Sequence, residues 1–210
     1  MPVGVGRPLS LDRLENLSDG VFSFAMTFLV FGLGVEDAFE LLEAGDARAG
    51  LREMAPRFLT LVLGLAGLGA FWLAHVIQFR HVRAVDRNLV FLNFLPLLFI
   101  ILMPFSIALW GRRWEDPWAI AVVGANLALF NGAMALEWLY LVRLRRESGD
   151  PIDERVRRRA AVGFLLPNLP WAALVLVAFV SPAASVALLV ASTLLYATPR
   201  LSRHLWGARR

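Results

Sequence analysis

The stretch RLENLSDGVFSFAMTFLVFGLGV, residues 13–35, decides the fold class of this chain. After Asp19 it contains no charged residue, and its only polar side chains there are Ser23 and Thr27. At 1.5 Å of rise per residue, a helix over residues 17–35 comes close to crossing the ~30 Å hydrocarbon core of a bilayer. The stretch therefore predicts a membrane-spanning helix. We expect Asp19 at its N-terminus, where unpaired backbone N–H groups favour an anion.

The composition of the whole chain agrees with a membrane protein. The chain has 210 residues, of which 58% are hydrophobic, and a mean hydropathy of +0.62. A soluble domain averages ~45–50% apolar residues, so this chain has too few polar residues to cover a water-exposed surface. It contains no cysteine, which excludes disulfides and thiolate metal sites. The composition predicts an all-α, polytopic membrane protein.

Further apolar runs of helical length follow the first one. Including the first, the predicted spans cover residues 17–35, 58–79, 88–110, 118–142, 160–180 and 183–198, and residues 36–57 are expected to form a polar connection. Pro96 and Pro104 lie inside the third span, where neighbouring helices can satisfy the carbonyls that a proline leaves free. We expect residues 1–210 to form a single six-helix transmembrane domain.

The arginines predict the orientation in the membrane. All 21 basic residues are arginine. With the N-terminus inside, 16 of the 21 fall in inner segments and 5 in outer loops, which is a strong positive-inside bias. Six spans with both termini in the cytoplasm fit this count best. The high pI of about 10.8 is then explained by anionic lipid headgroups on the cytoplasmic side, and no nucleic-acid partner is expected.

This topology places several polar side chains at a similar depth near the inner face. They are Ser18, Asp19, His75, Asn93, Glu137 and Asn168. Buried polar groups in lipid are costly unless they have partners, so residues that share a depth are expected to hydrogen-bond to one another. Two roles are open for this layer: it clamps helices together, or it positions the first span and so controls a gate.

The same residues carry a resemblance to a known family. RLENLSDG with Arg13, Ser18 and Asp19, followed by VFSFAMTFLV, resembles the first-helix signature of the bacterial branch of the transmembrane protein 175 potassium-channel family. Leu17 stands where that signature has phenylalanine. FWLAHVIQFR (residues 71–80) resembles the second helix of the family, and LVFLNFLPLLFIILMPFSIALWG (residues 89–111) resembles the third.

The resemblance implies a potassium-permeable cation channel of the bacterial plasma membrane. Members of this branch look like homotetramers in which the first helix of each subunit lines a central pore. The resemblance also implies a signature network made of Arg13, Ser18, Asp19, His75 and Asn93. Independently, the chain lacks a Thr-Val-Gly-Tyr-Gly filter loop. We expect no enzymatic activity, no catalytic residue, no metal site and no cofactor, with potassium as the permeant ion.

Two faces of the first span are candidates for the pore lining. Ser23 and Thr27 form a small, partly polar stripe at helical spacing. Phe24, Phe28 and Phe31 form a bulky neighbouring stripe, and the resemblance places the constriction there. Rings of phenylalanine could form a dewetted gate in place of a carbonyl filter, although an aromatic stripe is also common in ordinary helix packing.

Two other functions stay open at this point. One is a proton-coupled carrier or proton pathway in which His75, Asp19 and Glu137 exchange protons. The other is an accessory membrane protein that conducts nothing. Ohmic current would favour the channel, whereas saturable, pH-driven flux would favour the carrier.

Overall fold

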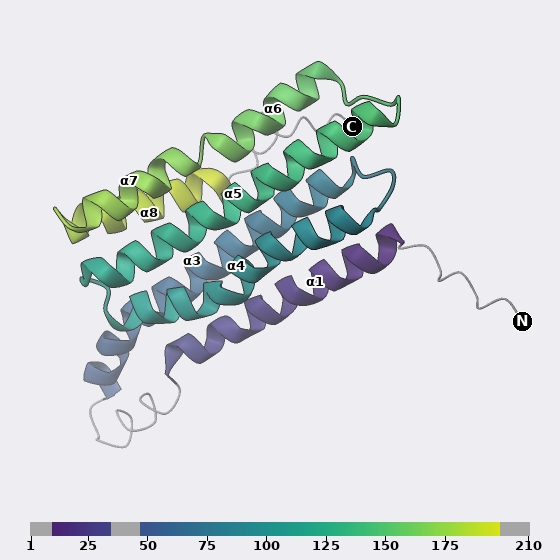
Figure 1. The fold of residues 1–210 in the computed structure, drawn as a ribbon. Helices are drawn as coiled ribbons and strands as arrows, with labels where there is room; N and C mark the ends of the chain where they lie inside the picture. Colours follow the sequence, from purple (N-terminus) through teal and green to yellow (C-terminus); the bar gives the residue numbers. More distant parts are fainter. Residues whose placement is uncertain (1–9, 35–46, 198–210) are drawn as a thin grey trace, which may run out of the picture.

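The computed structural model describes residues 10–34 and 47–197, and every regular element in this part of the chain is a helix. The long helices run side by side in alternating directions (Figure 1). The elements are α1 (Leu11–Phe28), the 3₁₀ helix η1 (Leu29–Leu33), α3 (Ala47–Phe79), α4 (Arg87–Arg112), α5 (Pro117–Glu147), α6 (Glu154–Leu165), α7 (Asn168–Ala178) and α8 (Pro182–Ala197). The predicted all-helical fold is confirmed for the described residues.

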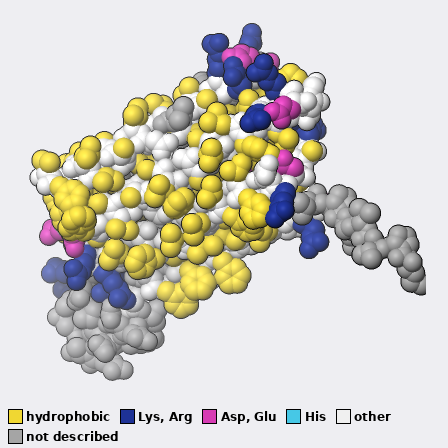
Figure 2. Space-filling view, in the orientation of Figure 1, with side chains coloured by type: hydrophobic (Ala, Val, Ile, Leu, Met, Phe, Trp, Pro, Cys, Tyr) yellow, Lys and Arg dark blue, Asp and Glu magenta, His cyan; other side chains and the backbone are white. Residues whose placement is uncertain are grey.

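Within residues 10–34 and 47–197, five helical segments are long and apolar enough to cross a membrane, and α8 is a shorter apolar helix. The five segments are Leu11–Leu33, Gly50–Phe79, Arg87–Arg112, Pro117–Glu147 and Glu154–Ala178. Arginines gather at the ends of the molecule, and apolar side chains cover the surface between them (Figure 2). This distribution matches a protein whose middle faces lipid.

Three helix boundaries differ from the bounds expected from the sequence. The polar connection expected over residues 36–57 is helical from Ala47 onward. Residues 47–55 are rich in Ala, Leu, Arg, Glu and Met, which favour a helix. Residues 36–46 lie outside the described residues. The fifth span begins at Glu154, not at residue 160, and divides into α6 and α7. Pro170 explains the division, because its ring clashes with the carbonyl four residues earlier.

The third correction concerns Asp19. Helix α1 begins at Leu11, so Asp19 lies well inside the helix and not at its N-terminus. The apolar stripe of α1 explains the early start, since it already includes Leu14 and continues through Ser18, Phe22 and Ala25, all buried. Residues spaced by three or four positions share one helix face. That face packs against α3 and α4, which leaves α1 at the edge of the bundle (Figure 1).

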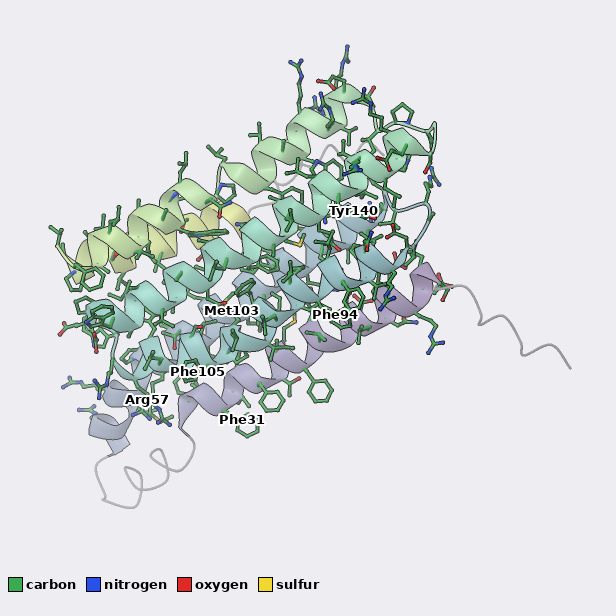
Figure 3. The ribbon with its side chains drawn as sticks, viewed as in Figure 1. Phe31, Arg57, Phe94, Met103, Phe105 and Tyr140 are labelled. Atoms are coloured by element: carbon green, nitrogen blue, oxygen red, sulfur yellow. The ribbon has the colours of Figure 1, made fainter. Side chains whose placement is uncertain are left out.

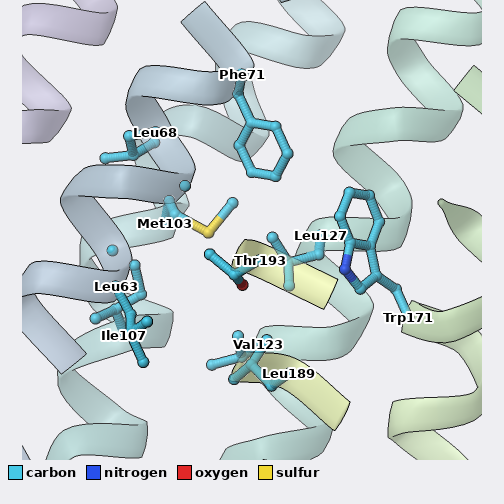
Figure 4. Close-up of a pocket in the computed structure, with 12 residues that line it drawn as sticks. Leu63, Leu68, Phe71, Met103, Ile107, Val123, Leu127, Trp171, Leu189 and Thr193 are labelled. Carbon is cyan, nitrogen blue, oxygen red and sulfur yellow. The ribbon is translucent and has the colours of Figure 1, made fainter. Parts of the chain in front are cut away.

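The interior of the bundle is closely packed. At Gly64 of α3, an added Cβ would lie 2.8 Å from Ile107 Cδ1 of α4, so the absence of a side chain lets the two helices approach. A small cavity of about 40 Å³ remains between α3, α4, α5, α7 and α8, and apolar side chains such as Phe71 and Met103 line most of it (Figure 4). This cavity is therefore too small and too apolar to serve as a polar passage between these helices.

Candidate functional site

A chain of three hydrogen bonds joins α1, α4 and α3 at the center of the site. His75 Nε2 lies 2.9 Å from Asn93 Oδ1, and Asn93 Nδ2 donates to Ser18 Oγ at 3.0 Å. Ser18 Oγ in turn donates to the carbonyl of Leu14 at 2.9 Å. Ser18 and Asn93 are fully buried, and His75 is 2% exposed. Three of the five predicted network residues are thus brought together as expected.

The direction of these hydrogen bonds determines that Nε2 of His75 carries a proton. Because the Ser18 hydroxyl donates its hydrogen bond to the carbonyl of Leu14, it must act as an acceptor toward the amide nitrogen of Asn93. The amide oxygen of Asn93 then faces His75, so Nε2 of the imidazole carries a proton and donates it. The imidazole stacks on Phe79, at 4.1 Å between ring centroids, and contacts the tilted ring of Phe22 at 5.7 Å. These two rings and the hydrogen bond to Asn93 together orient the imidazole.

Asp19 and Arg13 behave differently from the three buried residues. Asp19 is exposed and accepts a 2.8 Å hydrogen bond from Trp72 Nε1, which adds a second link between α1 and α3. Trp72 is one of the residues that carry the resemblance, although sequence reasoning gave it no role. Arg13 is exposed and contributes none of the hydrogen bonds found in the described network.

Glu137 and Asn168 do not join this network. Glu137 Oε2 accepts from Gln78 Nε2 at 2.9 Å, in a separate buried pair between α5 and α3. Asn168 Nδ2 donates to the carbonyl of Phe164 at 2.7 Å, across the break between α6 and α7. Sequence reasoning missed Gln78. It was detectable, since it lies three residues after His75 on the same helix and so faces the same way.

The uncovered surface of α1 and η1 carries an exposed aromatic ladder, defined as Phe24 and Phe28 of α1 and Phe31 of η1. Their side chains are 69%, 50% and 65% exposed, and successive ring centroids lie 6.1 and 5.4 Å apart. The 3₁₀ turn of η1 explains the close second pair, because residues i and i+3 eclipse in that geometry. Figure 3 shows Phe31 pointing away from the bundle.

Ser23 and Thr27 are exposed on the same helix, about a quarter turn away from the ladder. Thr27 Oγ1 donates to the carbonyl of Ser23 at 2.9 Å, so its hydroxyl keeps two lone pairs for other partners. Both predicted pore stripes therefore lie on the surface of a single subunit.

An open apolar groove of about 720 Å³ runs between α1 and α4 beside the ladder. Its lining includes Leu17, Gly20, Phe24 and Phe28 from α1 and Ile101, Pro104 and Phe105 from α4. Phe24, Phe28 and Phe105 are each at least half exposed. The surface of α1 that is left uncovered is thus continuous with an uncovered surface of α4.

Comparison with known proteins bears on this arrangement. A family model described as "Endosomal/lysosomal potassium channel TMEM175" matches residues 13–104, a region that includes Ser18, His75 and Asn93. A protein of Streptomyces collinus named a potassium channel is 31% identical over 173 residues, covering 80% of this chain and 82% of that protein. The chain belongs to the TMEM175 family.

Two further relatives extend the comparison. The human protein named endosomal/lysosomal proton channel TMEM175 is 36% identical over 104 residues, or 47% of this chain and 21% of that protein. A crystal structure of a lysosomal potassium-selective channel TMEM175 homologue from Chamaesiphon minutus matches with a TM-score of 0.78 at 20% identity. It covers 89% of this chain and 96% of that one. The fold is therefore that of a TMEM175 homologue, and the protein is a multi-pass membrane protein.

Proposed function

We propose that this protein is a potassium-permeable cation channel in which four copies surround a shared pore lined by α1. The main support for the proposal is that α1, in a chain of the TMEM175 family, has one buried face and one exposed face. One face is joined to α4 by the buried hydrogen bond from Asn93 to Ser18 and to α3 by the exposed bond from Trp72 to Asp19. The uncovered surface presents the aromatic ladder at the edge of the subunit. Relatives named potassium channels and proton channels support ion conduction.

The packing within one subunit supports a pore between subunits. An ion path needs polar groups or water along its length, whereas the cavity inside the described bundle is small and mostly apolar (Figure 4). The exposed surface of α1 offers both features that a hydrophobic gate requires. Phe24, Phe28 and Phe31 would form rings that expel water, and Thr27 and Ser23 would supply hydroxyls beside them.

The charge distribution supports six crossings with both termini in the cytoplasm of a bacterium. The start of α1, the turn between α3 and α4 and the loop between α5 and α6 lie at one end of the bundle (Figure 1). Of the 21 arginines, 16 belong to segments assigned to that side, so this end would face the anionic headgroups of the inner leaflet. The location proposed is the plasma membrane, with no cofactor and no nucleic-acid partner.

Purified protein in liposomes with a potassium gradient tests conduction directly. We expect passive potassium flux, and we expect Phe24→Ala, Phe28→Ala and Phe31→Ala each to increase it several-fold, because each removes a ring from the proposed constriction. Leu139→Ala is the matched control, since Leu139 is 63% exposed on α5 and would face lipid. Absence of flux in the wild type and in all three variants would instead support an accessory protein that conducts nothing.

Cysteine accessibility tests which surface of α1 faces the pore. The chain contains no cysteine, so a single introduced thiol can be followed without background. We expect Thr27→Cys and Phe31→Cys to react with a water-soluble thiol reagent and to block flux, whereas Leu139→Cys stays unreactive in the bilayer. Equal protection of all three positions would place α1 against lipid and reject the pore assignment.

The proton is the second candidate permeant, because several relatives are named proton channels. Among the described residues, the structure contains no direct hydrogen bond between Asp19, His75 and Glu137, which bind Trp72, Asn93 and Gln78 respectively. A pH-sensitive dye in the same liposomes distinguishes the cases. Flux that saturates and requires a pH gradient would favour a proton-coupled carrier over a channel.

A further inference from the structure

The pair formed by Gln78 of α3 and Glu137 of α5 has an unusual set of hydrogen bonds. Both side chains are 1% exposed, and the one bond between them runs from Gln78 Nε2 to Glu137 Oε2 at 2.9 Å. Within the described part of the chain, the remaining oxygen of each side chain, Gln78 Oε1 and Glu137 Oε1, is buried without a hydrogen-bond partner. Each such group normally finds a partner, so two orphaned oxygens in one pair require an explanation.

Among the described residues, no cation forms an ion pair with Glu137. The nearby titratable and charged groups have other partners: His75 bonds to Asn93, Asp86 to Tyr140 and Arg145 to Asp150, and His81 packs against Trp138. The arginines of α6 are exposed; they are Arg155, Arg157, Arg158 and Arg159. Helix α7 contains no titratable residue. Burying an unpaired carboxylate costs several kcal/mol, whereas a neutral acid avoids most of that cost.

We propose that Glu137 binds a proton on Oε1 and donates it to Gln78 Oε1. The acid and the amide then form a two-bond ring, in which each side chain donates once and accepts once. A single proton satisfies both orphaned oxygens and removes the buried charge. The ligand of this site is therefore a proton, and its effect is to hold α3 against α5.

The site has a direct structural route to the network on α1. Gln78 lies three residues after His75 on the same helix, so the proton site and the hydrogen-bond chain occupy one face of α3. Release of the proton would leave the carboxylate of Glu137 opposite the amide oxygen of Gln78, and two acceptors repel each other. The bound proton thus keeps α3 in the position from which His75 reaches Asn93. This inference holds whether or not the protein conducts ions.

Infrared spectroscopy of the purified protein tests the proposal without any assay of transport. We expect the wild type at neutral pH to show the carbonyl stretch of a protonated carboxylic acid, shifted by exchange into heavy water, and Glu137→Gln to lack it. Glu147→Gln is the matched control on the same helix. Glu147 is exposed and paired with Arg143, so the band should persist. A wild type without this band at neutral pH would overturn the proposal.

Thermal unfolding in detergent provides an independent readout. As the pH rises above the ordinary pKa of a glutamate, the wild type should lose melting temperature, because the unfolded chain releases this proton at a lower pH than the folded protein does. Glu137→Gln replaces the acid with an amide that needs no bound proton to donate, so its melting temperature should not show this loss. Gln78→Leu should lower the melting temperature at neutral pH and shift the acid band, since it removes both partners of Glu137. Identical losses of melting temperature with rising pH in the wild type and Glu137→Gln would contradict the assignment.

Discussion

Breaking the hydrogen-bond chain at Asn93 should destabilise the protein by an amount that the structure lets us estimate. Asn93→Leu removes two bonds between helices, to His75 and to Ser18. Such bonds in membrane proteins contribute about 0.6 kcal/mol each. The N–H of His75 is then buried without an acceptor, which costs about 1 kcal/mol more. The total of about 2 kcal/mol corresponds to a fall in melting temperature of about 4–8 °C for a chain of this size.

A double-mutant cycle distinguishes the energetic contribution of this hydrogen-bond chain from a general loss of packing. Ser18→Ala alone should cost about 1.5 kcal/mol, because it removes one bond between helices and orphans an Asn93 N–H. In the Asn93→Leu background the same substitution should cost almost nothing, since the bond has already been lost. Ser23→Ala is the matched control on the exposed face of α1, where surface changes stay within about 0.5 kcal/mol.

The assay is thermal unfolding of the detergent-solubilised protein, followed by tryptophan fluorescence. The reasoning fails if the costs of Ser18→Ala and Asn93→Leu add, because additivity would mean that the two residues act independently. It also fails if Ser23→Ala destabilises the protein as much as Ser18→Ala does. In that case the loss would not depend on the buried hydrogen-bond chain.

Two further predictions concern the end of the bundle where α3 is connected to α4. Asp86→Ala should lower the free energy of unfolding by about 2 kcal/mol, because Asp86 caps α4 by accepting from the backbone N–H of Leu89 and also accepts from the Tyr140 hydroxyl. Tyr140→Phe should lower it by less, as measured by thermal unfolding. Equal losses in the two variants would contradict the cap. Burial, followed by the charge of Arg145, lowers the pKa of His81 from its ordinary value of 6.5. As the pH falls, the unfolded chain therefore takes up the proton before the folded protein does, so the contribution of His81 to stability should be fully present above about pH 6.5 and should fall below it. The melting temperature of His81→Gln should depend less on pH in this acidic range. An unchanged dependence would refute the assignment.

The local pattern of the sequence determined the class of the protein and the core of the site. Uncharged apolar runs of bilayer length can satisfy their backbone groups in lipid only as helices, so the helical fold was predictable. The depth of polar residues along those helices brought Ser18, His75 and Asn93 together in the prediction, because a depth depends only on chain position and helix rise. In the structure these three residues form one hydrogen-bonded chain.

Tertiary structure decided the rotation of each helix about its axis and the choice between partners at the same depth. The sequence placed Glu137 beside the network, but the packing of α5 turns it toward Gln78. It also placed Asp19 at a helix end, whereas burial of Leu14 against the core extends α1 back to Leu11. Periodicity defines which residues share a helix face, but only contact with α3 and α4 determines which face of α1 is buried and which carries the exposed phenylalanines.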